Sequence, residues 1–543
     1  MPSTTDATPI DRRSVLRAIS VATAAGVAGA AIAPAPTAVA APPGNPTYVD
    51  PRDPRYDELT TGVNQRWVAK PDYIAVPRTT DDVVTAVQRA VDERKTLTVR
   101  SGGHCLADHV FNATVTAVID MSTMTDITYD DQRKAFGVEA GALLLNVYDE
   151  LYKSWGVTIP GGFCYSVGIG GHVCGGGFGL LSRRDGLTVD HLYAVEIVVV
   201  GPDRTARAVF ATRDADDPHR DLWWGCTGGG GGNFGVITRY WFRSPEAHGS
   251  NPRDQLVTPP DKVTISTVTI PWESLTRERF MRLLRNVGQW YEANSAPESP
   301  YIALSGSVTL THATSGAITL LTQIAADAAD SDTLLGTYLR EILAGVTDST
   351  TLPPTRTIPW LRATRLLSTG SAIGNNPMVR SDNHAAYHLR SHTEAQAEII
   401  YAALTSDSID NDHAMVVINP VGGRVGAVGP GDTAVAQRGA IMKVLYQSLW
   451  TNPADDAANI AWATRLFRTV YAATGNVPVP NDQTDGCYIN YPDTGTADPD
   501  ANLSGRPWSE LYYKSNYPRL QQIKSIWDPL DIFHHAQSIQ LPQ

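Results

Sequence analysis

Two glycine-rich stretches each carry a side chain that could form a covalent bond. Residues 100–105 read RSGGHC, so an imidazole, His104, follows two glycines, and residues 164–177 read CYSVGIGGHVCGGG, so a thiol, Cys164, precedes several more. A thiolate is a strong nucleophile. Because glycine packs nothing and costs conformational entropy, this density indicates a backbone that a large ligand approaches closely.

A third glycine run, GGGGGNFG at residues 228–235, contains the pattern G-x-G-x-x-G. The dinucleotide-binding fingerprint requires a strand before this pattern and a helix after it. Here a β-rich segment follows, and the preceding DLWWGCT does not read as a buried strand. The run therefore predicts no Rossmann unit, and no phosphate-loop motif is present. Its many backbone amides would suit the wrapping of a pyrophosphate.

The cysteines and histidines do not predict a metal site. The chain has five cysteines and no C-x-x-C pair, which disfavours structural zinc. Disulfides remain open, although an odd count leaves at least one thiol over. His534 and His535 are adjacent, so on a regular element they point apart, and we interpret them as structural.

The glycine loops lie among elements typical of an α+β domain. Residues 80–94 predict an amphipathic helix, because Val83, Val87 and Val91 share one face. A short strand at 97–100 leads into a turn that presents His104. Further strands are expected at 113–121, 135–141, 192–201 and 236–242.

The middle and end of the chain have a different character. Strands are expected at 262–270, 301–310, 317–324 and 414–425, and a helix at 273–293. These predict a second domain built on a largely antiparallel sheet covered by helices. Residues 486–493 predict a short strand and 516–529 a helix capped by Asn516, which we expect to return to the first domain.

The N-terminus predicts export. Arg12 and Arg13 precede an Ala-rich apolar run and small residues at 38–40, which indicates a twin-arginine signal peptide over residues 1–40, with an ordinary secretory signal as the alternative. The run is too short and Ala-rich for a good membrane anchor. The net charge of −12 disfavours nucleic acid and anionic membranes as partners.

Five motifs, in order, resemble those of the berberine-bridge-enzyme-like flavoprotein oxidases, which are of the vanillyl-alcohol-oxidase type. They lie at residues 100–105, 160–186, 228–238, 488–493 and 512–539. The resemblance covers nearly all of the mature chain and is strongest to the exported oxidases of antibiotic sugars. It implies a two-lobed PCMH-type FAD-binding domain, formed by 41–256 and completed by 486–543, around a substrate domain at 257–485.

The resemblance also implies an FAD held by two covalent bonds, from His104 to the 8α-methyl group and from Cys164 to carbon 6. Taken alone, His104 could cap a turn and Cys164 could be half of a disulfide. Cys105 has no implied role and is expected to be buried. The other implied cofactor-binding residues are Arg100, Ser101, Gly102, Gly103, Gly162, Val167, Gly168, Gly171, His172, Gly175, Gly176, Gly177, Asn233, Val236, Asn490 and Tyr491.

Oxidation of an alcohol needs a base for the hydroxyl proton, and the resemblance assigns this role to Tyr491. On a strand, Tyr488 and Tyr491 would face opposite ways, with Asn490 on the side of Tyr488. Free tyrosine has a pKa near 10, so a neighbour would have to lower it. The resemblance places that neighbour on the strand at 416–423 or at 441–450. Asn419 stands where some members use a second tyrosine, which disfavours a second oxidation step.

Together with the predicted export signal, the resemblance implies an exported FAD oxidase that converts a hydroxyl of a sugar, or of a glycosylated natural product such as a polyketide, to a ketone or lactone. Dioxygen would reoxidise the flavin and yield hydrogen peroxide. Its partners would be a small-molecule substrate and O2, with no nucleic acid and no membrane in the mature form. Alternatives are an oligosaccharide oxidase acting on the anomeric hydroxyl, a flavin dehydrogenase using another acceptor, and a binding protein on a degenerate flavin fold.

Overall fold

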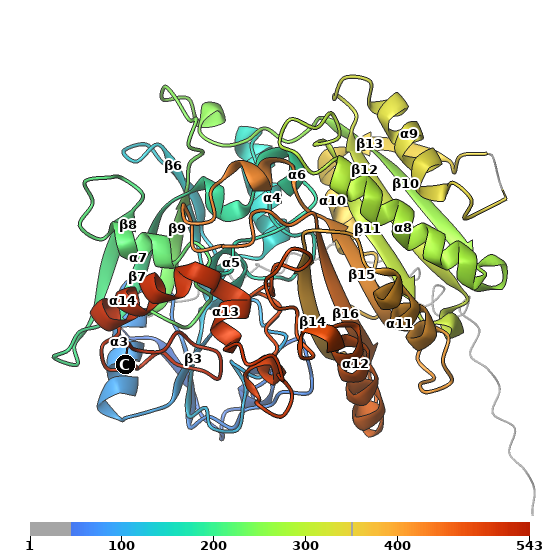
Figure 1. The fold of residues 1–543 in the computed structure, drawn as a ribbon. Coiled ribbons are helices and arrows are strands. Elements are labelled where there is room, and N and C mark those ends of the chain that lie inside the picture. The colour runs from blue at the N-terminus through green and yellow to red at the C-terminus, as the bar shows by residue number, and fades with distance from the viewer. Residues whose placement is uncertain (1–44, 349–350, 543) are drawn as a thin grey trace, which may run out of the picture. The chain divides into compact units, whose positions relative to one another are not determined.

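The computed structural model of the chain describes residues 45–348 and 351–542. The predicted export signal at 1–40 lies outside these residues. Residues Pro43–Gln543 form one compact unit, so the domain boundaries after 256 and 485 stay predictions. The strands form three sheets, of four, five and seven strands (Figure 1). Among the described helices, none is both long enough and apolar enough to cross a membrane.

The four-stranded sheet has the order β1-β2-β4-β3 and ends beside the first glycine motif. Strands β2 and β3 pair with β4 in parallel, as expected for strands joined by a crossover helix. That helix, α3, begins at a capping box formed by Thr79 and Asp82 and buries Val83, Val87 and Val91. The bounds are β1 (Thr47–Val49), α2 (Tyr56–Leu59), β2 (Tyr73–Val76), α3 (Thr80–Asp92), β3 (Leu97–Arg100) and β4 (Ala117–Asp120).

The five-stranded sheet is antiparallel throughout, with the order β5-β6-β9-β7-β8. Strand β9 follows the third glycine run directly, so the rejection of a Rossmann unit is confirmed. The bounds are β5 (Ile127–Asp130), β6 (Ala135–Glu139), α4 (Leu144–Trp155), α5 (Ile169–Cys174), α6 (Ser182–Asp185), β7 (Leu192–Val200), β8 (Ala206–Thr212), α7 (Arg220–Gly225) and β9 (Val236–Phe242).

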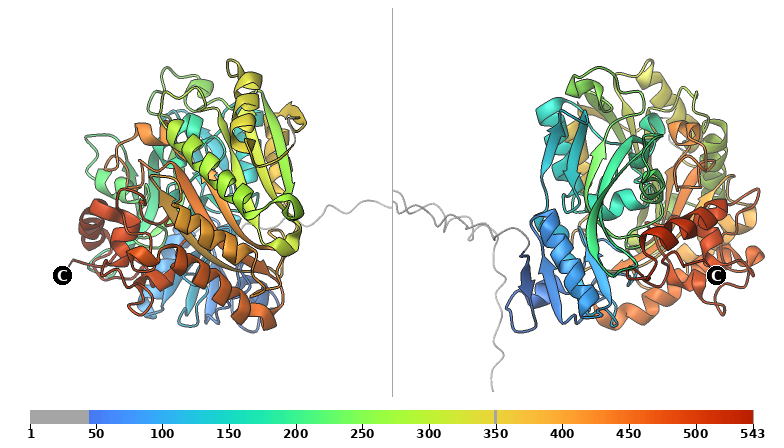
Figure 2. Two further views of the ribbon diagram at one scale, coloured as in Figure 1. Left: turned by 45° about the vertical axis from the view of Figure 1, so that its right-hand side comes forward. Right: turned by 90° about the vertical axis from the view of Figure 1, so that its left-hand side faces the viewer.

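The seven-stranded sheet is antiparallel, with the order β13-β10-β12-β11-β15-β16-β14. The left view of Figure 2 shows helices of this region lying across one face of the sheet. Helix α10 (Trp360–Ser368) is an exception, because its Trp360 packs on Tyr148 of α4. The strands are β10 (Lys262–Pro271), β11 (Leu304–Thr311), β12 (Ala317–Ala325), β13 (Thr355–Pro359), β14 (Arg380–His388), β15 (Ala414–Pro420) and β16 (Met442–Trp450). The helices are α8 (Arg277–Ala293), α9 (Ser331–Leu343), α10 (Trp360–Ser368), α11 (Glu394–Leu404) and α12 (Asp456–Val470).

A buried arginine joins the second glycine motif to this sheet. Arg183 of α6 is fully buried, and its guanidinium donates to the carbonyls of Leu304 and Asn294 at 3.0 and 2.7 Å and to that of Val421. Because an unpaired buried donor costs free energy, these bonds fix the motif against the ends of β11 and β15.

The C-terminal segment differs from the sequence prediction in two details. Residues 486–493 form no strand; a turn closes where the Tyr491 amide donates to the Tyr488 carbonyl at 2.8 Å. Helix α13 (Trp508–Tyr513) and helix α14 (Tyr517–Trp527) follow. Asn516 occupies the N-cap position of α14, but its side chain donates to the Pro430 carbonyl at 2.7 Å instead of capping the helix.

Candidate active site

The first two glycine motifs meet backbone to backbone. A Cβ atom at Gly102 would lie 2.2 Å from the Gly168 amide nitrogen, and one at Gly168 would lie 2.1 Å from Ser101 Oγ. No side chain fits at either position, so the close approach explains both glycines. Ser101 Oγ in turn donates to the Ala140 carbonyl at 2.6 Å. This contact brings the end of β3 next to the start of α5.

The two predicted attachment residues lie on these converging loops. His104 Nε2 is 2.8 Å from the hydroxyl of Ser166, which is two residues after Cys164. His104 is half-buried, and burial together with the charge of Arg100 lowers its pKa to about 4. The imidazole is therefore neutral at pH 7. Cys164 is exposed as a residue, although the protein around its thiol raises the pKa of that group by desolvation.

Tyr491 has a cationic neighbour on β16. Lys443 Nζ lies 3.4 Å from the Tyr491 hydroxyl oxygen and only 2% of the residue is exposed. The same ammonium group lies 4.4, 4.5 and 4.7 Å from the ring centroids of Phe178, Tyr491 and Tyr488. Three aromatic faces thus surround one buried cation.

Burial sets the protonation of this pair. Desolvation lowers the pKa of Lys443 to about 7, opposed by the negative charge of the Cys164 thiolate form. Desolvation also raises the pKa of Tyr491, further than Tyr488 and Cys164 do. The expected lowering of the Tyr491 pKa is therefore wrong for the chain itself, because burial disfavours the charged phenolate.

The tyrosine motif folds as a turn, which changes its side-chain directions. The rings of Tyr488 and Tyr491 pack together with centroids 5.1 Å apart, so the prediction that they face opposite ways is wrong. Asn490 donates to the Tyr488 hydroxyl at 3.1 Å and to the His172 carbonyl of α5 at 2.9 Å. A Cβ atom at Gly175 would lie 2.2 Å from Asn490 Oδ1. The motif is thus pinned onto the second glycine motif.

Two protein-family models match parts of the chain. That of the FAD binding domain matches residues 71–203, and that of berberine and berberine-like proteins matches residues 487–540. Aclacinomycin-N/aclacinomycin-A oxidase of Streptomyces galilaeus is 45% identical over 498 residues, which cover 91% of this chain and 90% of that protein. The chain belongs to the berberine-bridge-enzyme-like FAD-linked oxidases.

Other members of this oxidase family agree with the assignment. Hexose oxidase of Chondrus crispus is 32% identical over 538 residues, covering 90% of this chain and 94% of that protein. The solved structure of a glycopeptide hexose oxidase complexed with teicoplanin is 45% identical, with a TM-score of 0.87 and coverage of 92% of this chain and 100% of that one. The predicted α+β class with a PCMH-type FAD-binding fold is confirmed, as is the enzyme class, an FAD-dependent oxidase acting on hydroxyl groups.

The chemistry of the converging loops fits the flavin of this oxidase family. Arg100 pairs through Nη1 with Asp120 at 2.6 Å, while its Nε is buried without a partner among the described residues. That Nε would lie 3.2 Å from a Cβ atom at Gly103, which has φ = +73°. A charged N–H group without a hydrogen-bond partner, next to a glycine turn, suits the binding of an anionic cofactor.

The remaining predicted cofactor residues fall into two groups. Gly162, Val167, Gly171, His172, Gly176 and Gly177 lie in or beside α5, close to Cys164. The Gly162 amide donates to His172 Nε2 at 3.1 Å, which explains how His172 is held. Asn233 and Val236 are both buried, and the Asn233 side chain is engaged by the Gly229 carbonyl and the Ile539 amide, so it shapes the third glycine loop.

Lys443 is the residue that sequence reasoning did not name. The signal that could have found it is a single cation within the otherwise apolar start of β16, MKVLY. A lysine that is buried away from any carboxylate commonly has a functional role. Phe178 and Ser166, which contact Lys443 and His104, carry no comparable signal in the sequence.

The five cysteines, all within the described residues, are free thiols. Cys105 is half-buried, whereas it was expected to be buried. His535 stacks on His109 with centroids 4.3 Å apart and lies 3.2 Å from the Gly231 carbonyl, a packing role. No group of three potential ligands in the described part of the chain could hold a metal ion.

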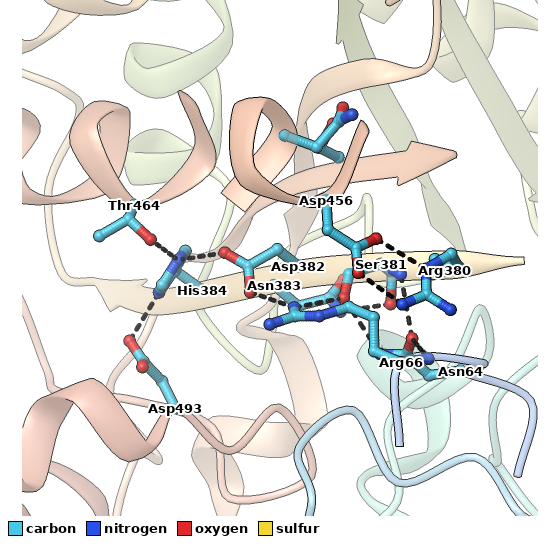
Figure 3. Close-up of polar contacts among 12 residues, drawn as sticks. Asn64, Arg66, Arg380, Ser381, Asp382, Asn383, His384, Asp456, Thr464 and Asp493 are labelled. Atoms are coloured by element: carbon cyan, nitrogen blue, oxygen red, sulfur yellow. Dashed lines mark hydrogen bonds and ion pairs between the residues drawn. The ribbon is translucent and has the colours of Figure 1, made fainter. Parts of the chain in front are cut away.

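A buried charge network holds the tyrosine motif against the seven-stranded sheet. His384 of β14 lies between two carboxylates, 2.6 Å from Asp493 and 3.0 Å from Asp382, and Asp382 pairs with Arg66 at 2.6 Å (Figure 3). Although burial opposes charge, the two carboxylates raise the pKa of His384 to about 10. Asp493 follows Tyr491 by two residues, so this imidazolium anchors the loop that carries Tyr491.

Proposed function

We propose that this chain is an exported oxidase that removes a hydride from a hydroxyl-bearing carbon of a sugar or glycosylated natural product, using FAD bonded to His104 and Cys164. The observation that carries the proposal is the convergence of four groups. His104 contacts Ser166, and Cys164 lies two residues from Ser166. The negative charge of a Cys164 thiolate raises the pKa of both Lys443 and Tyr491. Two nucleophiles and a buried proton acceptor thus share one site.

The Lys443–Tyr491 pair would act as the base. FAD, when bound, would accept the hydride and pass two electrons to dioxygen, giving hydrogen peroxide. The pair loses one proton as the pH rises through about 7, the value to which burial lowers the Lys443 pKa. In that state Tyr491 Oη takes the substrate's hydroxyl proton while its own proton moves 3.4 Å to Lys443 Nζ.

The attachment chemistry is supported by the state of each nucleophile. His104 is neutral at pH 7, and because Ser166 occupies its Nε2, Nδ1 is the nitrogen left to bond the cofactor. Desolvation raises the pKa of the Cys164 thiol, and the positive charge of Lys443 opposes this and favours the thiolate. Two attachments would free the ring from enclosure, so bulky substrates could reach it.

The proposal of a sugar-bearing substrate and of export draws on different observations. The similar proteins named above are an aclacinomycin oxidase, a hexose oxidase and a glycopeptide hexose oxidase. Asn419 provides no second phenol beside Tyr491, so we propose a single oxidation step. The twin arginines at 12 and 13 support export of the folded, cofactor-loaded protein.

The experiment is a peroxide-release assay across aldoses, oligosaccharides and glycosylated polyketides. We expect stoichiometric peroxide from at least one glycosylated polyketide under air. Activity confined to aldoses and oligosaccharides would favour the anomeric-hydroxyl alternative. Turnover with a dye acceptor but without peroxide in air would show a dehydrogenase, and a colourless active preparation would contradict the flavin chemistry.

A further inference from the structure

A strip of side chains, half-exposed on β15, leads away from Lys443 along the seven-stranded sheet. In the β15–β16 pairing, Asn419 is opposite Lys443, Val417 opposite Leu445 and Met415 opposite Gln447. Paired residues of antiparallel strands, and residues two apart on one strand, share a face. These side chains therefore lie on the same face as Lys443.

Helices α8, α11 and α12 lie on the other face, and α10 covers this face only near β10 and β13. On β15 the half-exposed residues Asn419, Val417 and Met415 alternate with the buried Val416 and Ile418. The buried set packs in the core shared with α8, α11 and α12. On β16, Gln447 is half-exposed as well. A half-exposed row on β15 thus runs from Asn419, opposite Lys443, to Met415, opposite Gln447, and we call this row the path.

The amide of Gln447 is held in a fixed orientation. Its Nε2 donates to Asn383 Oδ1 at 2.5 Å, and Asn383 Nδ2 donates to Ser381 Oγ at 2.8 Å. Asn64 holds the Ser381 backbone, accepting from its amide at 3.1 Å and donating to its carbonyl at 3.0 Å (Figure 3). Gln447 Oε1 makes no hydrogen bond to the described residues and is not buried. A pre-oriented acceptor therefore faces the path.

The spacing and polarity of the path suit two linked sugar rings. Gln447 follows Lys443 by four positions on β16, a span of about 13 Å at the usual rise per residue. That distance exceeds one pyranose ring and is close to two joined end to end. Between the two polar ends lies Val417, a half-exposed apolar side chain able to contact the apolar face of a ring, paired with the buried Leu445.

We propose that Gln447 Oε1 accepts a hydrogen bond from a hydroxyl of the sugar next to the one being oxidised. This inference rests on the proposed function and narrows its substrate class. The enzyme would favour compounds that carry at least two linked sugars, with the oxidised ring at Lys443 and Tyr491 and the adjoining ring at Gln447.

The test compares substrates that differ by one ring. We would measure kcat/KM by peroxide release for an anthracycline bearing one sugar against one bearing two, and for glucose against cellobiose. Gln447→Met keeps the side-chain length and removes the acceptor. It should lower kcat/KM for the two-ring substrate about 3- to 10-fold, the effect of one lost hydrogen bond, and leave that of the one-ring substrate unchanged.

Thr269→Val is the matched control. Thr269 of β10 is exposed. It is on the same face of the sheet as Leu445, four strands from β16, because the successive cross-strand partners between them are Thr319, Thr309 and Val417. It should change neither rate. An unchanged ratio of the two kcat/KM values in Gln447→Met, whether both fall equally or neither falls, would overturn the inference. Peroxide release by the wild type in the same assay would still support the proposed function. Absence of turnover with every sugar would overturn both.

Discussion

Replacing Tyr491 with phenylalanine should slow flavin reduction by the sugar about 10²- to 10⁴-fold, which is the usual contribution of a general base to the rate. The phenol lies 3.4 Å from Lys443 Nζ, and no other hydroxyl is hydrogen-bonded to that amine among the described residues. Removing only the oxygen keeps the ring, which packs on Tyr488 and Lys443. The measurement is the anaerobic rate of flavin bleaching after mixing with substrate.

Tyr488→Phe is the control for that variant. Its hydroxyl accepts from Asn490 and is not bonded to Lys443, so its loss should change the bleaching rate less than tenfold. If Tyr491→Phe reduced the flavin at the wild-type rate with its flavin content unchanged, Tyr491 would not carry the proton.

Replacing Lys443 with methionine should move the acid limb of the kcat/KM profile from about pH 7 towards and beyond pH 10. In the wild type the pair must lose one proton to become active, and burial lowers the Lys443 pKa to about 7. Activity therefore rises with pH through that value. Without the amine, Tyr491 alone must ionise, and desolvation raises its pKa above 10. At pH 7 the variant should retain less than about 1% of the activity, from the tenfold loss per pH unit below the limb.

The pH profile separates this role from a structural one. A lysine that served only as packing would, on replacement, lower the activity by the same factor at every pH. Lys443→Arg offers a further comparison, because a guanidinium stays protonated and cannot accept the proton. It should remain slow at all pH values below 10. An unshifted acid limb in Lys443→Met would contradict the proton-acceptor role.

Local patterns were enough to predict most of the elements around the site. Helix α3 followed from its capping residues and valine spacing, and the three glycine motifs followed from their density. The seven-stranded sheet followed from alternation, as in β15, where every second residue is buried. These features depend on interactions between residues that are near in sequence, which is why the sequence alone reveals them.

The site itself depends on contacts between distant residues. Lys443 and Tyr491 meet because β16 and the C-terminal turn pack together, and nothing in either segment specifies the other. Residues 486–493 alternate like a strand, but the Tyr491 amide bonds locally to Tyr488 and Asn490 bonds to His172 of α5. Tertiary contacts here override a short pattern. The direction of the Tyr491 pKa likewise required its burial to be known.

The most direct test of the account is to find where the flavin is attached. Wild-type protein would be denatured, digested and mapped by tandem mass spectrometry with detection at the flavin absorbance. We expect one flavin that joins two peptides, one containing His104 and the other Cys164, with the bond to each lost in His104→Ala and Cys164→Ala respectively. FAD released intact by acid precipitation, or attached at other residues, would contradict the site described here.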